Sequence, residues 1–309
     1  MGEGENRKVK NNNELKGIIL MLVASLIWSF STVMIKTAID DLGPWTFNMV
    51  RSFLGALSMV PLVFIFDFKL NKTEGQKLQL TPAVWRDCIA LGVVIGSYMV
   101  LAQTGMAYTT IGKTGFITAL YIIIVPVFGI FLHRKQPLRI WLCVAVALIG
   151  FYLMSMTEGL STINKGDVLI FIGAIFCAFQ IYLIDSLAKR ISPMLLTCFQ
   201  FLFAGLFCMV GAFIFEQPAV DEIMNAIVPL LYTGIVSCGI GYMIQAFGQK
   251  FLDPVKSSFL FSSETIFTMI LGFLVFHEIM SAREYIGCAL IFFAIIYSLI
   301  EPKEKGKSN

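Results

Sequence analysis

Two ionisable side chains stand inside long apolar stretches, where a charge is costly to bury. Glu264 is flanked by Ser262, Ser263 and Thr265 in one stretch, and Arg51 lies well inside another. A charge at the centre of a bilayer costs about 2.5–3.5 kcal/mol, so such residues normally have a partner or face water. A desolvated carboxylate favours its neutral form, which suits Glu264 to carrying a proton or binding an amine. Arg51 suits a ligand carboxylate, which arginine binds through two parallel hydrogen bonds.

Both charges also have purely structural interpretations. Glu264 is then a buried acid that pairs with Arg51 or Lys36. Arg51 instead snorkels outward, or pairs with Asp40 or Asp41 at the edge of its stretch. The order of residues along the chain does not decide between these alternatives, because it does not say which stretches are neighbours.

Three lysines lie near the ends of apolar stretches. Lys36 and Lys113 are expected at outer ends and Lys256 at an inner end. Snorkelling of the ammonium group toward water is the commoner explanation for such residues. Lys113 and Lys256 also occupy matching positions in the internal repeat described below, which indicates matched roles at two gates.

Neutral polar and aromatic side chains inside the apolar stretches are the remaining candidates for lining a cavity. They are Trp28, Gln103, Tyr121, Gln180, Tyr242 and Gln245. Packing or hydrogen bonding between helices is the alternative for each of them. The chain has no C-x-x-C pair and only two histidines, so we expect no catalytic residue, metal site or cofactor, and the seven cysteines are interpreted as apolar packing residues.

The composition indicates that these residues are positioned by helices in a membrane. Of the 309 residues, 57% are hydrophobic and 14% are charged, and the mean hydropathy is +0.81. A soluble domain has about 25% charged residues, because water must solvate its surface. The formal net charge of +3 is too small to indicate nucleic-acid binding.

Ten stretches are long enough to cross a bilayer, which takes about 20 apolar residues in a helix. They cover residues 17–37, 45–66, 86–107, 112–132, 139–157, 167–187, 194–215, 226–249, 255–276 and 283–300. The connections between them are short and leave no room for a soluble domain. The predicted fold is therefore an all-α integral membrane protein, with polar tails at residues 1–16 and 301–309.

An internal repeat divides the ten stretches into two sets of five. An offset of 149 residues pairs Gly17 with Gly166 and Pro44 with Pro193, and an offset of 143 pairs Lys113 with Lys256. The repeats are expected at residues 17–157 and 166–300. Five is an odd number, so the second repeat must be inverted relative to the first. Inverted repeats are the architecture of alternating access, with a binding site near the midplane.

Positive charge is distributed unevenly between the two sets of loops. With the N-terminus inside, most of the 23 Lys and Arg residues fall in inner segments, and the outer loops hold only Lys165 and Arg283. Cytoplasmic loops of membrane proteins carry this excess. We therefore expect a multi-pass protein of the cytoplasmic membrane with both chain ends in the cytoplasm.

Several motifs resemble the EamA-type branch of the drug/metabolite transporter superfamily across essentially the whole chain. Trp28-Ser-Phe-Ser31 followed by Lys36 is similar to the first-helix pattern, and Gln103 through Tyr121, ending at Pro126, is similar to the signature of the third and fourth helices. Ser263-Glu264 and His277-Glu278 resemble features of the second half. The resemblance implies a secondary transporter that exports or exchanges amino acids or similar metabolites.

The function expected from these observations is movement of a small polar molecule across the membrane, with a proton as the candidate coupling ion. No Gly-x-x-x-x-Gly-Lys-Ser/Thr motif is present to bind a nucleotide. A lipid-modifying enzyme and a membrane sensor or scaffold are the alternatives, but the chain has no cluster of catalytic groups and no effector domain. The partners expected are the small-molecule ligand and the bilayer, with a homodimer as an alternative to the monomer.

Overall fold

The computed structural model describes residues 3–38, 42–70, 80–109, 111–155, 163–276 and 281–300, and every regular element in these ranges is a helix. The first half contains α1 (Glu3–Ala38), α2 (Pro44–Leu62), the π-helix η1 (Val63–Leu70), α4 (Pro82–Met106), α5 (Ile111–Ala119), α6 (Tyr121–Phe131) and α7 (Leu138–Ser155). The second half begins with α8 (Lys165–Leu187), α9 (Pro193–Phe215), α10 (Val220–Asn225) and α11 (Ile227–Leu231). It continues with the π-helix η2 (Tyr232–Gly241), α12 (Tyr242–Gln249), α13 (Pro254–Phe261), α14 (Ser263–Phe276) and α15 (Ala282–Leu299).

Local sequence signals explain where several helices begin. The helices α4, α9 and α13 each begin with a proline that directly follows a capping residue. The capping residues are Thr81, Ser192 and Asp253, and their side chains accept hydrogen bonds from backbone N–H groups of the first turn. Asn164 and Asp167 form a capping box at the start of α8. These caps satisfy backbone donors that lipid could not.

The helices differ from the ten uninterrupted stretches in four places. The stretch 45–66 changes from α2 to the π-helix η1 at Val63. The stretch 112–132 is divided at Leu120 into α5 and α6, and the stretch 255–276 is divided at Ser262 into α13 and α14. The stretch 226–249 consists of α11, η2 and α12. In addition, α1 begins at Glu3, so helix extends through most of the segment expected to be a polar tail.

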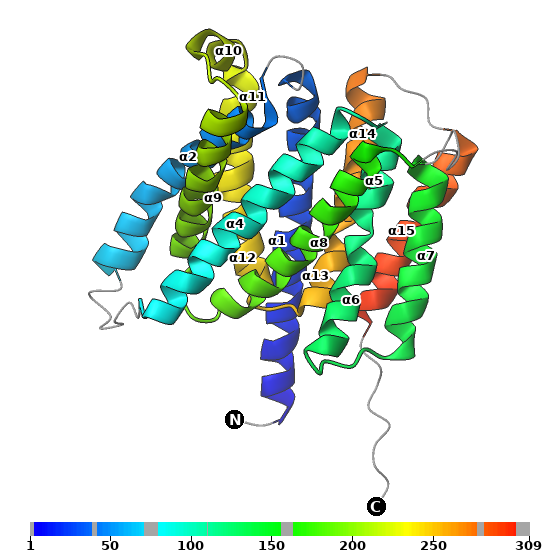
Figure 1. Cartoon of the computed structure of the whole chain (residues 1–309). Helices are drawn as coiled ribbons and strands as arrows, with labels where there is room; N and C mark the ends of the chain where they lie inside the picture. Colours follow the sequence, from blue (N-terminus) through cyan, green and yellow to red (C-terminus); the bar gives the residue numbers. More distant parts are fainter. Residues whose placement is uncertain are drawn as a thin grey trace, which may run out of the picture.

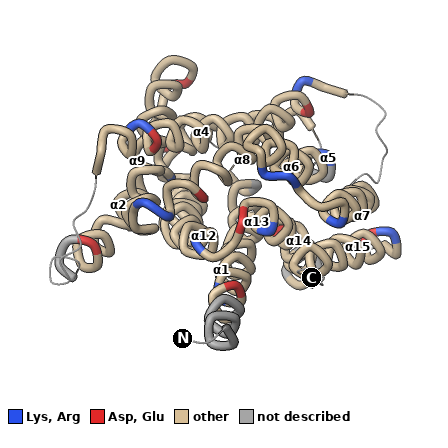
Figure 2. Tube along the Cα trace, turned by 90° about the horizontal axis from the view of Figure 1, so that it is seen from below, with Lys and Arg blue, Asp and Glu red and all other residues tan. Residues whose placement is uncertain are grey.

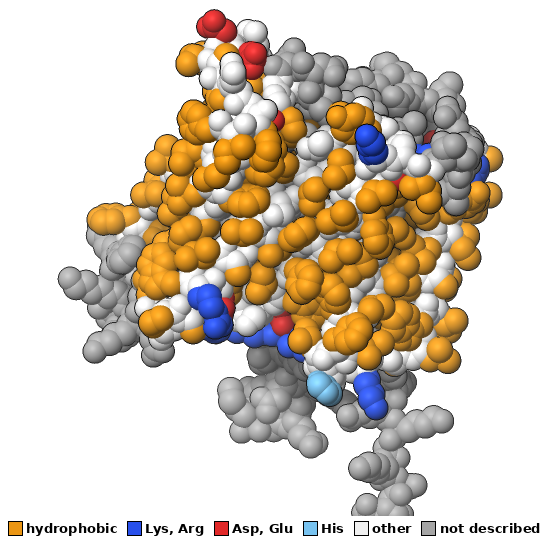
Figure 3. All heavy atoms as spheres, viewed as in Figure 1, with side chains coloured by type: hydrophobic (Ala, Val, Ile, Leu, Met, Phe, Trp, Pro, Cys, Tyr) orange, Lys and Arg blue, Asp and Glu red, His pale blue; other side chains and the backbone are white. Residues whose placement is uncertain are grey.

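The helices are long and apolar enough to place this protein in a membrane. Among the described residues, eight helical segments could cross a bilayer by length and composition, and Leu138–Met154 is a shorter apolar helix. Figure 3 shows a broad hydrophobic belt, with Lys, Arg and His side chains at its lower edge and acidic side chains on the projection at the top. Such a belt matches the hydrocarbon layer between two polar boundaries.

Two ends of the molecule are distinguished by the chain termini. In Figure 1, α1 begins and α15 ends at the bottom, which we call the terminal face, and α10 marks the opposite end, which we call the far face. Viewed from below, α2, α4 and α9 lie on one side, α5, α6, α7 and α15 lie on the other, and α8 and α12 lie between them (Figure 2). The largest contacts are those of α2 with α9, α4 with α8, and α7 with α15.

The α2–α9 pair is joined at both ends by carboxylates. At the far face, Glu216 accepts hydrogen bonds from the backbone N–H groups of Trp45 and Thr46, at 3.0 and 2.8 Å. The helix α2 has no side-chain cap of its own, and a Cβ at Gly43 would collide with the Glu216 carboxylate. At the terminal face, the Ser192 hydroxyl that caps α9 donates to Asp67. Asp67 and Glu216 are 149 residues apart, the offset of the repeat.

Candidate functional site

Both halves of the chain contribute to one cavity of about 350 Å³. Its walls come from α1, α2, α4, α5, α6 and α7 of the first half and from α8, η2, α12, α13 and α14 of the second. Met106 and Met154, which line it, lie in the last turns of α4 and α7, and Thr114 lies in the first turn of α5. These turns belong to the far face, so the cavity extends from the middle of the bundle toward that face. Its size is within the usual range for small-molecule sites.

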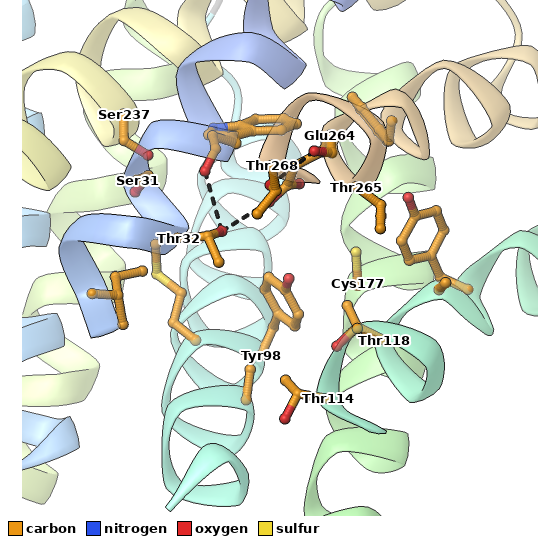
Figure 4. Close-up of a pocket in the computed structure, with 18 of the residues that line it drawn as sticks. Ser31, Thr32, Tyr98, Thr114, Thr118, Cys177, Ser237, Glu264, Thr265 and Thr268 are labelled. Atoms are coloured by element: carbon orange, nitrogen blue, oxygen red, sulfur yellow. Dashed lines mark hydrogen bonds between the residues drawn. The ribbon is translucent and has the colours of Figure 1, made fainter. Parts of the chain in front are cut away.

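Glu264 lies in the cavity wall at the start of α14. Its carboxylate accepts a hydrogen bond of 3.1 Å from the Thr32 hydroxyl on α1, which also lies 3.2 Å from the Trp28 carbonyl oxygen (Figure 4). The first turn of a helix favours a negative charge, because its backbone N–H groups are unpaired. No ion pair of Glu264 occurs among the described residues. The alternative of pairing with Arg51 therefore does not apply, and the side chain of Lys36 lies outside the described residues.

Arg51 lines the same cavity from α2 and is 5% exposed. Its guanidinium carbon lies 5.4 Å from the centre of the Phe47 ring, and its Nε has no hydrogen-bond partner. The described part of the chain contains no ion pair of Arg51, while Asp40 and Asp41 lie outside that part. The helix is held close to η2 at this level, since a Cβ at Gly234 would lie 3.0 Å from the Arg51 carbonyl oxygen. A buried guanidinium of this kind is the type of group that binds carboxylates through charge-assisted hydrogen bonds.

Aromatic rings form the inner wall of the cavity. Trp28 contacts Tyr242 and Phe261, with ring centroids 4.9 and 5.2 Å apart. Tyr242 in turn contacts Phe201 at 4.9 Å. The indole Nε1 of Trp28 is buried without a hydrogen-bond partner. This wall therefore presents large ring faces to the cavity, while the indole N–H lies buried toward Gly241.

Two sets of amides lie around the cavity. Gln103, which is 4% exposed, accepts a hydrogen bond of 2.8 Å from the Asn48 amide, and its own Nε2 has no partner. On the side toward the terminal face, Gln180 donates to Gln245 at 3.4 Å, and Gln245 donates to Gln249 at 3.0 Å. This chain of amides leads from the cavity into the closed part of the bundle.

Tyr121 and Glu264, which the repeat offset pairs, occupy matching positions after a helix break. Tyr121 begins α6 after the break at Leu120, and Glu264 lies in the first turn of α14 after the break at Ser262. Both side chains line the cavity. Each break is a single tight turn, as shown by the backbone hydrogen bonds Leu120 N–H to Ile117 O and Ser262 N–H to Phe259 O. The two halves therefore bring equivalent positions to the cavity.

Lys113 and Lys256 lie outside the cavity and form ion pairs between the halves. The Lys113 ammonium lies 3.6 Å from the Asp167 carboxylate of α8. Lys256 on α13 pairs with Glu14 on α1. The repeat relates α5 to α13 and α8 to α1, so the two pairs are equivalent contacts at opposite faces. Pairing of this kind replaces the snorkelling interpretation for both lysines.

The terminal face is closed by further links between the halves. They are the ion pairs of Arg134 with Asp185 at 3.1 Å and of Arg190 with Asp87 at 2.6 Å, in addition to Lys256 with Glu14. Beneath the cavity, the backbones of α1 and α12 are also in close contact. If Gly17 carried a side chain, its Cβ would lie 3.2 Å from the Gly248 carbonyl oxygen. The cavity is therefore separated from this face by packed helices and ion pairs.

Several lining residues were not among the candidates chosen from the sequence. The hydroxyls of Thr32, Thr114, Thr118, Thr265 and Thr268 line the cavity, as does the Cys177 thiol. Figure 4 shows them around the same space as Glu264 and Tyr98. Their spacing of three or four residues within apolar stretches is a signal for one polar helix face. His277 and Glu278 lie outside the described residues.

Comparison with known proteins identifies the family. The chain matches the EamA-like transporter family over residues 15–156 and again over residues 164–300. An uncharacterized transporter of Archaeoglobus fulgidus is 27% identical over 279 residues, covering 90% of this chain and 83% of that protein. The uncharacterized transporter YoaV of Bacillus subtilis is 22% identical over 283 residues, covering 90% of this chain and 94% of that protein.

A solved crystal structure of another protein shares the fold. It superposes with a TM-score of 0.71 at 17% sequence identity, over 91% of this chain and 97% of the other. Two consecutive matches to one family account for the two halves, and their helices surround a common cavity. The protein is therefore a transporter and not an enzyme, and it belongs to the EamA-like transporter family of the drug/metabolite transporter superfamily.

Proposed function

We propose that this protein exports a small zwitterionic metabolite, an amino acid or a related compound, across the cytoplasmic membrane by alternating access. A zwitterion requires one site for its ammonium group and one for its carboxylate. In this proposal Glu264 binds the ammonium group, Arg51 binds the carboxylate, and the rings of Trp28 and Tyr242 contact the remaining part of the molecule. A proton that neutralises Glu264 competes with the substrate and couples transport to the proton gradient.

One observation carries the proposal. Glu264 and Arg51 line a single cavity from different halves of the chain, and neither has an ion-pair partner among the described residues. Two opposite charges with no such compensation are unfavourable in an empty site and become favourable when a ligand with complementary charges binds. A cavity of about 350 Å³ also has room for a molecule of amino-acid size.

Inversion of the two halves is the second part of the proposal. The carboxylates Asp67 and Glu216 hold the second helix of the opposite half at opposite faces. Lys113 and Lys256 likewise form equivalent pairs at opposite faces. Such reciprocal contacts are expected when ten transmembrane helices form two five-helix repeats of opposite polarity. Exchange of the two conformations would then open the cavity to either face in turn.

The terminal face is proposed to be cytoplasmic. Among the described cations, Lys165 and Arg283 lie at the far-face starts of α8 and α15, whereas a larger set lies in the loops or helix ends of the terminal face: Arg86, Arg134, Lys189, Arg190 and Lys250. Cytoplasmic loops carry such an excess of positive charge. The conformation described above then has its cavity directed outward, with the cytoplasmic side closed.

Transport by reconstituted protein tests the role of Glu264. Proteoliposomes that contain the full chain are assayed for flux of a panel of radiolabelled amino acids, with and without an imposed pH gradient. Glu264→Gln removes the titratable group but keeps the shape of the side chain, so we expect flux to lose its response to the pH gradient. Glu222→Gln on α10, outside the cavity, is the control and should keep the response. An unchanged response in Glu264→Gln would remove this residue from the coupling mechanism.

A further inference from the structure

Three sulfur atoms from three different helices meet at the edge of the cavity. The Cys288 Sγ on α15 lies 3.5 Å from the Met154 Sδ on α7 and 3.9 Å from the Met269 Sδ on α14. Both methionines line the cavity, so a solute in the cavity can reach their side chains, and Cys288 is in contact with both. We call Met154, Met269 and Cys288 the sulfur cluster. These residues are distinct from Glu264 and Arg51, which account for the proposed transport.

We propose that the sulfur cluster binds a single Cu(I) ion, or another soft monovalent metal ion, with Cys288 as thiolate and the two methionines as thioether ligands. Thiolate and thioether sulfurs select Cu(I), whereas carboxylate and imidazole ligands select other metals. No carboxylate or imidazole belongs to the cluster. On binding, the metal ion replaces the thiol proton of Cys288, the proton passes to water in the cavity, and the oxidation state of the metal does not change.

The distances within the cluster suit one bound ion. A metal–thiolate bond is about 2.3 Å long, so three sulfurs arranged around one ion in a plane lie about 4 Å from one another. The two separations observed, 3.5 and 3.9 Å, need little change to reach that arrangement. A methionine side chain has three rotatable bonds and can make this adjustment without movement of the backbone.

Close backbone packing holds two of the ligands in place. A Cβ at Gly150 would lie 2.8 Å from the Gly287 carbonyl oxygen, and one at Gly287 would lie 2.6 Å from the Gly150 carbonyl oxygen. Met154 is one turn beyond Gly150, and Cys288 directly follows Gly287. The glycine contact between α7 and α15 therefore holds the backbones of these two residues close together. Met269 completes the cluster from α14, the helix that carries Glu264.

This arrangement predicts an effect of metal on the cavity wall. The helix α14 has its largest contact with α1 and only a small contact with α15. A metal ion bound by all three sulfurs would therefore attach α14 to the α7–α15 pair. This step rests on the proposed function: if alternating access moves α14 relative to the α7–α15 pair, the bound ion should inhibit flux.

Binding of Ag(I), a redox-inert analogue of Cu(I), tests the site without any transport assay. The purified full chain in detergent is titrated with Ag(I) against a competing chelator, and the protons released per bound ion are measured. We expect one tight site that releases one proton. Cys288→Ala and Met269→Leu should each weaken it by at least about tenfold, since even the loss of an outer-shell partner costs 10–100-fold in metal affinity.

Cys177→Ala is the matched control, because Cys177 also lines the cavity but belongs to none of the Cys–Met sulfur contacts among the described residues. This variant should bind Ag(I) like the wild type. Met→Leu nearly conserves side-chain volume, so Met269→Leu should fold normally, which a thermal unfolding curve without metal checks. Unchanged affinity in Cys288→Ala or in folded Met269→Leu, or loss of the tight site in Cys177→Ala, would overturn the proposal.

Inhibition of flux is a separate measurement that rests on the proposed function. Ag(I) should slow flux through the wild type and should have much less effect on Met269→Leu, which retains every thiol. If Ag(I) inhibited flux equally in the wild type and in Met269→Leu, the inference that the metal ion attaches α14 to the α7–α15 pair would be wrong. A protein that binds Ag(I) as expected but shows no flux would contradict the proposed function and not the metal site.

Discussion

At the scale of single residues, the partly buried Glu264 and the buried Arg51 are the groups that the proposed function assigns to ligand binding. Glu264 has a hydroxyl donor in Thr32, and Arg51 has the ring of Phe47 beside its guanidinium. Neither contact neutralises a charge. In the proposed function, these two groups therefore bind complementary charges of a ligand.

Replacement of Arg51 should weaken binding of a substrate carboxylate. A hydrogen bond to a charged group contributes about 1.5–3 kcal/mol, so Arg51→Gln should raise the apparent KM for flux by roughly 10- to 100-fold. Arg51→Lys keeps the charge but loses the planar donor pair, and an intermediate KM is expected. The measurement is the concentration dependence of amino-acid flux into proteoliposomes.

Lys113→Gln is the control for Arg51, because it removes a cation that pairs with Asp167 outside the cavity. Its KM should stay close to that of the wild type. A KM that is equally unaffected in Arg51→Gln would mean that Arg51 does not bind the substrate.

The sequence predicted part of this site for a physical reason. Ionisable and amide groups stand out in an apolar stretch, so Glu264, Arg51, Gln103 and Gln180 could be chosen as candidates. Thr32 could not, because its role depends on contact with a residue 232 positions away. Threonine is also common in transmembrane helices for packing, so its presence alone indicates no site.

At the scale of helices, hydrogen bonds to side-chain carboxylates join helices of the two halves. Glu216 caps the start of α2, which has no side-chain cap of its own. Asp67 accepts a hydrogen bond from the hydroxyl of Ser192, the residue that caps α9. The pair α2–α9 is therefore connected at both faces. Arg51 lies between these connections, on the helix that they hold in place.

Loss of the Glu216 carboxylate should destabilise the far-face end of α2. Replacing a helix cap costs about 0.5–2 kcal/mol, so Glu216→Ala should lower the free energy of unfolding by roughly this amount. Thermal unfolding of the purified protein in detergent measures the change. Asp221→Ala on the exposed helix α10 is the control and should have little effect. Equal stability of Glu216→Ala and the wild type would show that the contact does not hold α2.

The positions of the helices followed from apolar length, but their interruptions did not. The break at Leu120 lies among mostly apolar residues and the break at Ser262 begins the polar run Ser262–Thr265, and neither has a glycine or proline at the break. A break of this kind depends on tertiary contacts and has no local signal. The caps of α4, α9 and α13 did have a signal, since a capping residue directly precedes a proline in each case.

At the scale of the whole molecule, the two halves surround one cavity that extends toward the far face. The terminal face is closed by ion pairs that join the halves, including Lys256 with Glu14 and Arg134 with Asp185. Of these side chains, Asp185 is 3% exposed, and Lys256 and Glu14 are only 14% and 19% exposed. Opening of the closed face therefore requires that water reaches the charges that a rearrangement of the halves sets free.

Accessibility of Cys177 from the two sides of the membrane tests this account most directly. Cys177 lines the cavity. The chain has other free cysteines, so the labelling of Cys177 is measured as the difference between the wild type and Cys177→Ala. Vesicles of both orientations are treated with a charged, membrane-impermeant thiol reagent, with and without the amino-acid panel. Alternating access predicts that Cys177 is modified from either side, faster from the side opposite the chain termini. Modification from one side alone, with or without the amino acids, would contradict it.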